Sequence, residues 1–234
     1  MSPKAEKGWV VVSLGGSLIV PATGIAIDFL RRFKRALEEL VEHGYAFVIV
    51  TGGGATARGY QHAAASLTHV PAEDLDWLGI HATRLNAHLL RTIFREDASL
   101  RIITNPEADP LPDDARVIIG AGWRPGRSTD YDAVVLAQRL GAKTIVNLSD
   151  VPYVYDANPR EHPDAKPIER MTWLELEEVV GDSWSPGLNA PFDPVAAKEC
   201  RKSGISVSIL SGSDIANVKK ALLGEQFTGT LVKG

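Results

Sequence analysis

Two glycine-rich segments each follow a short β-branched stretch of the chain. They are LGGS at residues 14–17, after residues 10–12, and TGGG at residues 51–54, directly after the segment 46–50. Glycine lets backbone N–H groups approach a phosphate closely, and a helix that follows adds a favourable dipole. Two tight strand-to-helix turns without any ligand would have the same composition. Because two such loops occur in one chain, the pattern favours a phosphate site.

Cationic and hydroxyl side chains accompany these loops. Arg58 follows TGGG, in what we expect to be the first turn of a helix, where it could reach the same anion. The loop WRPGRSTD, residues 123–130, places two arginines, two hydroxyls and a carboxylate just before another helix. Arginine suits phosphate oxygens, so this loop is typical of a site for an anionic substrate. The alternative is a solvated loop in which Ser128, Thr129 or Asp130 only caps the helix.

Four further polar residues have both a chemical and a structural interpretation. Lys198 lies one turn into the helix that Asp193 begins, where it could stabilise the charge on a phosphoryl group in transfer. Taken alone, a helix lysine is more typical of a solvated surface. Asp76 precedes a helix and, taken alone, indicates an N-cap. Tyr155 and Asn158, in VPYVYDANP, taken alone indicate a turn.

Several common alternatives lack their motifs. The chain has no phosphate loop ending in Gly-Lys-Ser/Thr and no nucleophile elbow. GGGATA at residues 52–57 satisfies a dinucleotide-binding pattern, but no acidic residue closes a second strand about 20 residues later. The six histidines have no metal-binding spacing, and Cys200 is the single cysteine. These patterns argue against a Walker-type nucleotidase, a dinucleotide enzyme and a zinc site.

The elements that must position these residues alternate between strands and helices. We expect strands at residues 10–12, 46–50, 102–103, 117–119, 143–148, 205–210 and 228–232, and helices at residues 28–43, from 78 to 93, up to 140, up to 180, 194–204 and 214–223. Such alternation predicts an α/β fold: a mainly parallel central sheet with helices on both faces, which is a three-layer α/β/α sandwich. Ligands bind at the carboxyl ends of the strands in such sheets, and the glycine loops lie there.

Composition and charge argue against some classes of binding partner. The chain has 234 residues, of which 44% are hydrophobic and 23% charged, so one domain over residues 1–234 is expected. Its net charge is −4 and its basic residues are scattered, which argues against a nucleic-acid surface. No apolar run approaches the ~20 residues that cross a bilayer, and the start MSPKAEKGWVVV is unlike a signal peptide. We therefore expect a cytoplasmic protein without a membrane partner.

Read in order, the blocks of the sequence resemble the amino-acid kinase family. The blocks are SLGGSLIVP, IVTGGGATARGY, DWLGIHATRLNAHLL, RPGRSTDYDAVVLA, VYDANP, FDPVAAKECRKSGI and EQFTGTLV. Within that family the resemblance is to the archaeal-type uridylate (UMP) kinases, and it runs nearly end to end. It implies the amino-acid-kinase fold, with an acceptor-side half at about residues 1–140 and an ATP-side half at about residues 141–234.

The resemblance also implies roles for individual residues. Lys198 would be catalytic, and Asp130 would be the carboxylate that organises the charged groups. The residues implied for ATP are Gly16, Ser17, Gly54, Arg58, Ser149, Asp150, Tyr155 and Asn158. The residues implied for UMP are Gly53, Asp76, Trp123, Arg124, Pro125, Gly126, Arg127, Ser128 and Thr129. Among them, Asp76 would recognise the sugar of UMP.

The activity implied by the resemblance is ATP-dependent phosphorylation of UMP to UDP, in pyrimidine nucleotide biosynthesis. Mg²⁺ would be bound through the ATP phosphates, and the family assembles as homo-hexamers built from dimers. The chain departs from the family pattern at Ser13, where many members have a lysine, and in SDVPYVYDANP and RSTD. These departures leave two alternatives: an ATP-binding molybdenum or tungsten storage or regulatory protein of this fold, and a related kinase with another small acceptor.

Overall fold

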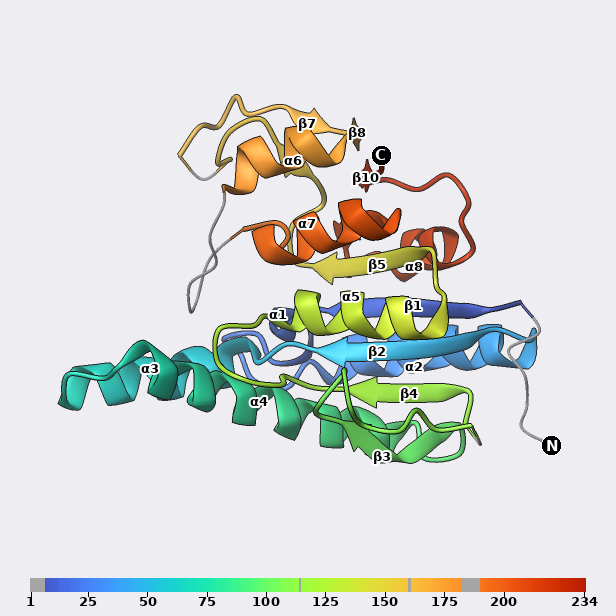
Figure 1. Ribbon diagram of the computed structural model, residues 1–234, viewed down its shortest axis with the longest axis horizontal. Helices are drawn as coiled ribbons and strands as arrows, with labels where there is room; N and C mark the ends of the chain where they lie inside the picture. Colours follow the sequence, from blue (N-terminus) through green and yellow to red (C-terminus); the bar gives the residue numbers. More distant parts are fainter. Residues whose placement is uncertain (1–6, 114, 160, 182–189) are drawn as a thin grey trace.

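The core of the fold is an eight-stranded sheet with the order β3-β4-β2-β1-β5-β9-β10-β8 (Figure 1). The computed structural model describes residues 7–234 apart from 114, 160 and 182–189, and all counts refer to these residues. The strands of this sheet are β1 (Trp9–Leu14), β2 (Ala46–Thr51), β3 (Ala98–Ile103), β4 (Val117–Gly120), β5 (Thr144–Ser149), β8 (Arg170–Met171), β9 (Ser206–Ser211) and β10 (Thr230–Val232). A separate antiparallel pair consists of β6 (Val154–Tyr155) and β7 (Pro167–Ile168).

Most neighbouring strands of the sheet run parallel. At the centre, Val12 of β1 is opposite Ile49 of β2 on one side and Val146 of β5 on the other. The pairs β2–β4, β3–β4 and β5–β9 are also parallel, and β10 runs antiparallel to β9. The carboxyl ends of β1, β2, β4, β5 and β9 therefore meet at one edge of the sheet. In Figure 1 the arrowheads of β2, β4 and β5 point to that edge, on the side where α3 projects.

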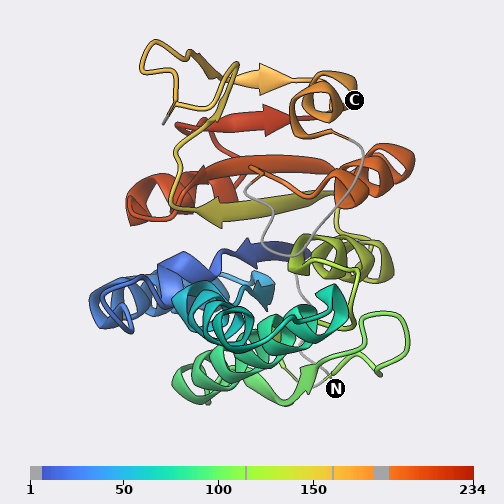
Figure 2. The same ribbon diagram turned by 90° about the vertical axis from the view of Figure 1, so that its left-hand side faces the viewer.

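Helices cover both faces of the sheet (Figure 2). The helices are α1 (Gly16–Ile19), α2 (Ile27–Glu42), α3 (Gly54–Leu67), α4 (Ala72–Ile93), α5 (Thr129–Leu140), α6 (Trp173–Val180), α7 (Pro194–Ser203) and α8 (Ile215–Leu222). Because side chains alternate along a strand, Phe47 packs in the core with α2, α4 and α8, whereas Val48 packs in a second core with α5, α6 and α7. The predicted three-layer α/β/α sandwich is confirmed.

Short-range sequence signals set the starts of α6 and α7, two of the helices that pack in the second core. Thr172 and Glu175 form a capping box at α6. Asp193 caps α7, with its Oδ1 accepting hydrogen bonds from the N–H groups of Val195 and Ala196, and α7 ends at Gly204 in the left-handed conformation. Among the described residues, no helix is both long enough and apolar enough to cross a membrane.

Helix α4 starts earlier than the sequence predicts. The helix begins at Ala72, after Pro71, with two acidic residues in its first turn. Acidic side chains stabilise the N-terminus of a helix, and this start lies ahead of the first apolar residue of the periodic pattern. Asp76 therefore lies in the second turn of α4, and its interpretation as an N-cap is wrong.

Candidate active site

The two glycine loops touch each other through their backbones. A Cβ atom added to Gly16 would lie 2.0 Å from the nitrogen of Gly54, and one added to Gly52 would lie 2.5 Å from the nitrogen of Gly16. Gly54 has a φ of +64°, and a Cβ there would lie 2.3 Å from the carbonyl oxygen of Gly16. Only glycine fits such contacts without a shift of the backbone. The ends of β1 and β2 and the start of α3 are thereby held together at the carboxyl edge.

The other residues predicted around the glycine loops lie in the second loop itself or on the helices that follow the loops. Gly53 packs toward α4, because a Cβ there would lie 3.3 Å from the oxygen of Gly79. Ser17 is half-buried in α1. Arg58 is exposed on α3 and is the fifth residue of that helix, one residue beyond the first turn that the sequence predicts. The helix begins at Gly54 itself, which accounts for the difference.

Asp130 connects three segments at this edge. Its Oδ1 accepts hydrogen bonds from Ser13 Oγ at 2.7 Å and from Asn147 Nδ2 at 3.0 Å. Its Oδ2 accepts from the N–H of Asp193 at 3.2 Å. Burial raises the pKa of Asp130 to about 6, and the negative charge of Asp193 adds to the rise. The Asp130 carboxylate thus joins the end of β1, β5 and the start of α7.

Lys198 lies on the helix that this carboxylate anchors. It is half-buried and follows the Asp193 cap by one turn and a residue. Helix α7 also packs its buried Ala196, Ala197 and Cys200 into the core that contains α5. The structure therefore fixes the start of the helix of Lys198 beside Asp130.

Helix α4 holds the acceptor loop, which we define as residues 121–128 between β4 and α5. Asp76 is buried, and its Oδ2 accepts a hydrogen bond from the N–H of Gly126 at 2.8 Å. Burial raises the pKa of Asp76. Arg84 Nη2 donates to the oxygen of Trp123 at 3.1 Å, and Thr83 Oγ1 accepts from the N–H of Gly122 at 2.8 Å.

Sequence reasoning missed Thr83 and Arg84. A signal for Thr83 was present, because Asp76 and Thr83 are seven residues apart, which is nearly two helical turns. Both lie on the same side of α4 as the buried Ile80 and Ala87. Polar residues on the buried face of a helix need partners, and here these partners are backbone groups of the acceptor loop.

The acceptor loop carries two arginines that rest on aromatic rings. The guanidinium of Arg124 lies 3.9 Å from the centre of the Trp123 ring, and that of Arg127 lies 4.6 Å from the centre of the Tyr131 ring. Ser128 caps α5, since its Oγ accepts from the N–H of Tyr131 at 3.2 Å. Pro125 lies between the two arginines, and Thr129 is the first residue of α5.

Asp132, in the first turn of α5, is a buried carboxylate that sequence reasoning missed. Only 1% of its surface is exposed, and its Oδ2 accepts from the N–H of Trp123 at 3.1 Å. Burial raises the pKa of Asp132 well above its ordinary value, and the charges of Asp130 and Asp193 raise it further. A carboxylate beside the apolar run 133–137 of a helix is the signal that would have found it.

Of the residues predicted for ATP, the four that follow Leu148 in the sequence lie in two places. Ser149 ends β5 next to the first glycine loop, where a Cβ on Gly15 would lie 3.4 Å from the Cα of Ser149. Asp150 follows it and is exposed. Tyr155 belongs to the small β6–β7 pair, and Asn158 Nδ2 donates to Glu161 at 2.9 Å. The structure thus brings Ser149 to the glycine loops, whereas Tyr155 and Asn158 lie on the segment that follows β5.

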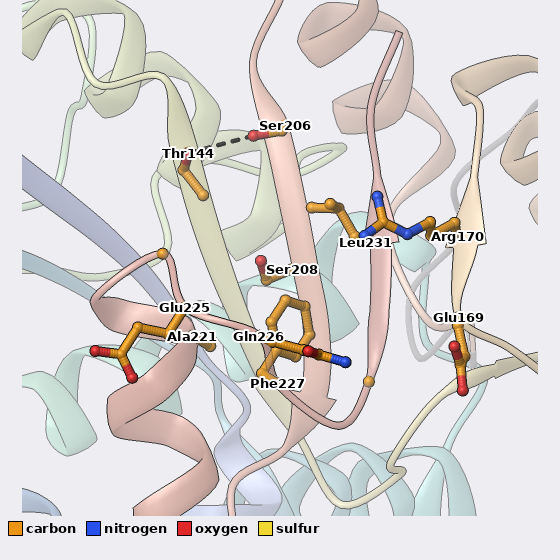
Figure 3. Close-up of a pocket in the computed structure, with 12 residues that line it drawn as sticks. Thr144, Glu169, Arg170, Ser206, Ser208, Ala221, Glu225, Gln226, Phe227 and Leu231 are labelled. Carbon is orange, nitrogen blue, oxygen red and sulfur yellow. Dashed lines mark hydrogen bonds between the residues drawn. The ribbon is translucent and has the colours of Figure 1, made fainter.

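A pocket of about 450 Å³ lies elsewhere on the molecule. It is lined by residues of β5, β8, β9, α8 and β10 and by the segment after α8. Figure 3 shows the hydrogen bond between the hydroxyls of Thr144 and Ser206 on its wall. The two oxygens are 3.2 Å apart. None of its lining residues is a predicted site residue, so the chemistry is assigned to the glycine edge. The described residues hold no cluster of three or more His, Cys, Asp or Glu side chains that could bind a metal ion.

Comparisons with known proteins match this arrangement over nearly the whole chain. A model of the amino acid kinase family matches residues 8–211. The uridylate kinase of Hyperthermus butylicus is 34% identical over 97% of this chain and 99% of that protein, and the uridylate kinase of Methanospirillum hungatei is 37% identical over 95% and 94%. The crystal structure of uridylate kinase from Archaeoglobus fulgidus superposes with a TM-score of 0.80 at 32% identity, over 95% of this chain and 99% of that one.

Proposed function

Because this chain belongs to the amino acid kinase family, we propose that it phosphorylates UMP to UDP with ATP as the phosphoryl donor. The observation that carries the proposal is the backbone contact between the two glycine loops at the carboxyl edge, beside Asp130. The contact occurs in a chain that is similar to two proteins named uridylate kinases, and the similarity covers 94–99% of the length of those proteins. Such a reaction is a step of pyrimidine nucleotide biosynthesis.

The reaction needs positioning and charge stabilisation more than proton transfer. A nucleoside monophosphate is already largely ionised near pH 7, so its phosphate oxygen attacks in line without a general base. Both oxygens of Asp130 are engaged by three donors, which suits this residue for orienting the start of α7 rather than for accepting a proton. Lys198 stabilises the negative charge of the transferring group.

The proposal assigns separate sets of residues to ATP and to UMP. In the proposal, the first glycine loop and the start of α3 hold the ATP phosphates, and Gly53 faces the acceptor. The remaining ATP-side residues are Ser17, Arg58, Ser149, Asp150, Tyr155 and Asn158. Asp76 and residues 123–129 hold UMP. In the proposal, Mg²⁺ enters with ATP, bound through the ATP phosphates.

Purified protein with Mg²⁺ and ATP is expected to convert UMP to UDP and to prefer UMP over CMP, AMP and GMP. A coupled assay of ADP release over a panel of these monophosphates measures the preference, with acetylglutamate and molybdate as additional candidates. Turnover of acetylglutamate alone would transfer the proposal to a related kinase with another acceptor. Binding of ATP without turnover of any monophosphate would favour a storage or regulatory protein.

Asp76→Ala is expected to raise the Michaelis constant for UMP about 10- to 100-fold and to leave that for ATP nearly unchanged. Asp76 accepts from the N–H of Gly126 in the acceptor loop. In the proposal it also accepts from ribose hydroxyls of UMP, and losing a charge-assisted hydrogen bond of that kind costs about 1.5–3 kcal/mol. Steady-state kinetics with each substrate varied would measure the change. Asp74→Ala, an exposed position in the first turn of α4, is the matched control. An unchanged constant for UMP in Asp76→Ala would contradict the assignment.

The assembly and location remain part of the same proposal. We expect a homo-hexamer built from dimers that works in the cytoplasm, with nucleotides as its partners and without nucleic acid or membrane. The reason for this expectation is that the chain belongs to the amino acid kinase family. Light scattering of the purified protein tests the assembly, and a monomer would contradict it.

A further inference from the structure

Two charged residues at the acceptor loop each have a buried side-chain atom without a hydrogen-bond partner. Oδ1 of Asp132 is one, and Nε of Arg127 is the other. The first is an acceptor on a carboxylate and the second is a donor on a guanidinium, so the two atoms are complementary. Buried polar atoms nearly always have a partner, and an orphaned one costs free energy. Both orphans lie at the loop proposed to bind the acceptor nucleotide.

The electrostatics around Asp132 favour the approach of a cation. Asp130 and Asp193 place negative charge near its carboxylate, and Arg127 is the cation that opposes them. The other oxygen of Asp132 is engaged by the N–H of Trp123 at the start of the loop. A guanidinium that reached Oδ1 would therefore satisfy the carboxylate without breaking its existing hydrogen bond.

Arg127 is held by contacts that a small rearrangement would change. Its guanidinium rests on the Tyr131 ring, and its Nη1 donates to the oxygen of the preceding Gly126 at 3.2 Å. Gly126 has a φ of +77° and is fixed to Asp76 through its N–H. A carboxylate thus holds the loop near each of its ends. Asp132 accepts from the N–H of Trp123, and Asp76 accepts from the N–H of Gly126. Arg127 follows Gly126 directly.

We propose that Asp132 is a positioning residue for UMP, which draws the Nε–H of Arg127 to its free oxygen when the nucleotide binds. The ion pair leaves terminal nitrogens of the Arg127 guanidinium to donate to an oxygen of the nucleotide. This inference rests on the proposed function. It gives Asp132 a role in UMP affinity without contact to the substrate.

A double-mutant cycle on UMP binding tests the pair. Calorimetry without ATP gives the dissociation constant of UMP for the wild type, Arg127→Gln, Asp132→Asn and the double variant. Asparagine keeps one oxygen for the N–H of Trp123 and replaces the charged free oxygen by an NH₂ group, which cannot accept from Arg127. Each single variant is expected to weaken UMP about 10-fold or more, the scale of a lost charge-assisted hydrogen bond, and the double variant to bind no more weakly than Arg127→Gln.

Further measurements separate positioning from a merely structural role. The Michaelis constant for ATP and the melting temperature of Asp132→Asn are expected to stay at wild-type values, because the change removes a buried charge without opening a cavity. Arg127→Lys is expected to bind UMP as weakly as Arg127→Gln, since lysine keeps the charge but cannot serve two partners with a planar fork. Asp109→Asn, whose carboxylate also accepts from backbone N–H groups, is the control and leaves UMP affinity unchanged.

The opposing outcomes are distinct. If the losses of the two single variants multiply in the double variant, the pair is not coupled and the inference fails while the proposed function stands. Wild-type affinity in Arg127→Lys has the same consequence, and it holds even where Asp132→Asn does not fold. If the wild-type protein binds no UMP at all, the proposed function fails and this inference fails with it.

Discussion

Replacing Gly16 by alanine is expected to lower the turnover of UMP by about 10²-fold or more. The added Cβ would meet the nitrogens of Gly54 and Gly53 at 2.0 Å and 2.7 Å and the carbonyl carbon of Gly52 at 2.6 Å. All three are backbone atoms, so no side-chain rotation relieves the contacts and the two glycine loops must separate. Displacing phosphate-binding groups by about 1 Å is enough to cost two orders of magnitude in rate.

The measurement is the turnover number at saturating ATP and UMP, together with a thermal melt. Gly59→Ala is the matched control, because Gly59 lies in the same helix α3 and a Cβ there meets nothing within 4 Å. That change is expected to stabilise the fold by about 0.5–1 kcal/mol and to leave turnover unchanged. Wild-type turnover in Gly16→Ala would show that the loops need not touch for catalysis.

The sequence allowed the fold to be predicted because its signals are local. The capping box of Thr172 with Glu175 and the Asp193 cap of α7 each act within three residues, so neighbouring letters contain the whole interaction. The alternation of Val11 and Val12 between two cores likewise follows from strand geometry. The strand–helix order and the carboxyl edge were predictable for the same reason.

The contacts that shape the site were not predictable, since they join distant parts of the chain. Ser13 and Asp130 are 117 positions apart, and Asp76 and Gly126 are 50 apart. Neither Ser13 nor Asp76 has a neighbour in the sequence that indicates its hydrogen-bond partner. The cap interpretation of Asp76 was wrong because the start of α4 depends on Pro71 and the acidic first turn rather than on apolar periodicity. Asp132 was overlooked because its partner is a backbone N–H, which every residue but proline provides.

Ser13 changes what the rest of the site has to supply. The sequence departs there from the family pattern, in which many members have a lysine. In the structure the Ser13 hydroxyl is buried and donates to Asp130, so it contributes no positive charge. The developing charge on the transferring phosphoryl group must then be stabilised by backbone N–H groups, by the Mg²⁺ that we propose enters with ATP, and by a cation from elsewhere. Lys198 is the cation that we assign to this role.

Lys198→Met is accordingly expected to lower turnover by roughly 10²- to 10³-fold, the size of effect for one preorganised donor. An interaction made mainly in the transition state appears in turnover rather than in ground-state binding, so the Michaelis constant for ATP should change little. Methionine is unbranched and a good helix former, and the anchor of α7 is the Asp193–Asp130 hydrogen bond, so the melting temperature should also change little.

The control for this prediction lies one turn further along the same helix. Lys202 is exposed and forms an ion pair with Glu199 at 2.7 Å. Lys202→Met removes one positive charge from α7, as Lys198→Met does, but at a position one turn further from the start of the helix. Exposed pairs of this kind contribute about 0–1 kcal/mol, so this variant should keep both its stability and its turnover. Equal turnover in the two variants would mean that Lys198 acts only as a solvated helix residue. A large loss confined to Lys198→Met would place its charge at the reacting phosphate, because each variant removes one lysine from the same helix and leaves its Asp193 cap unchanged.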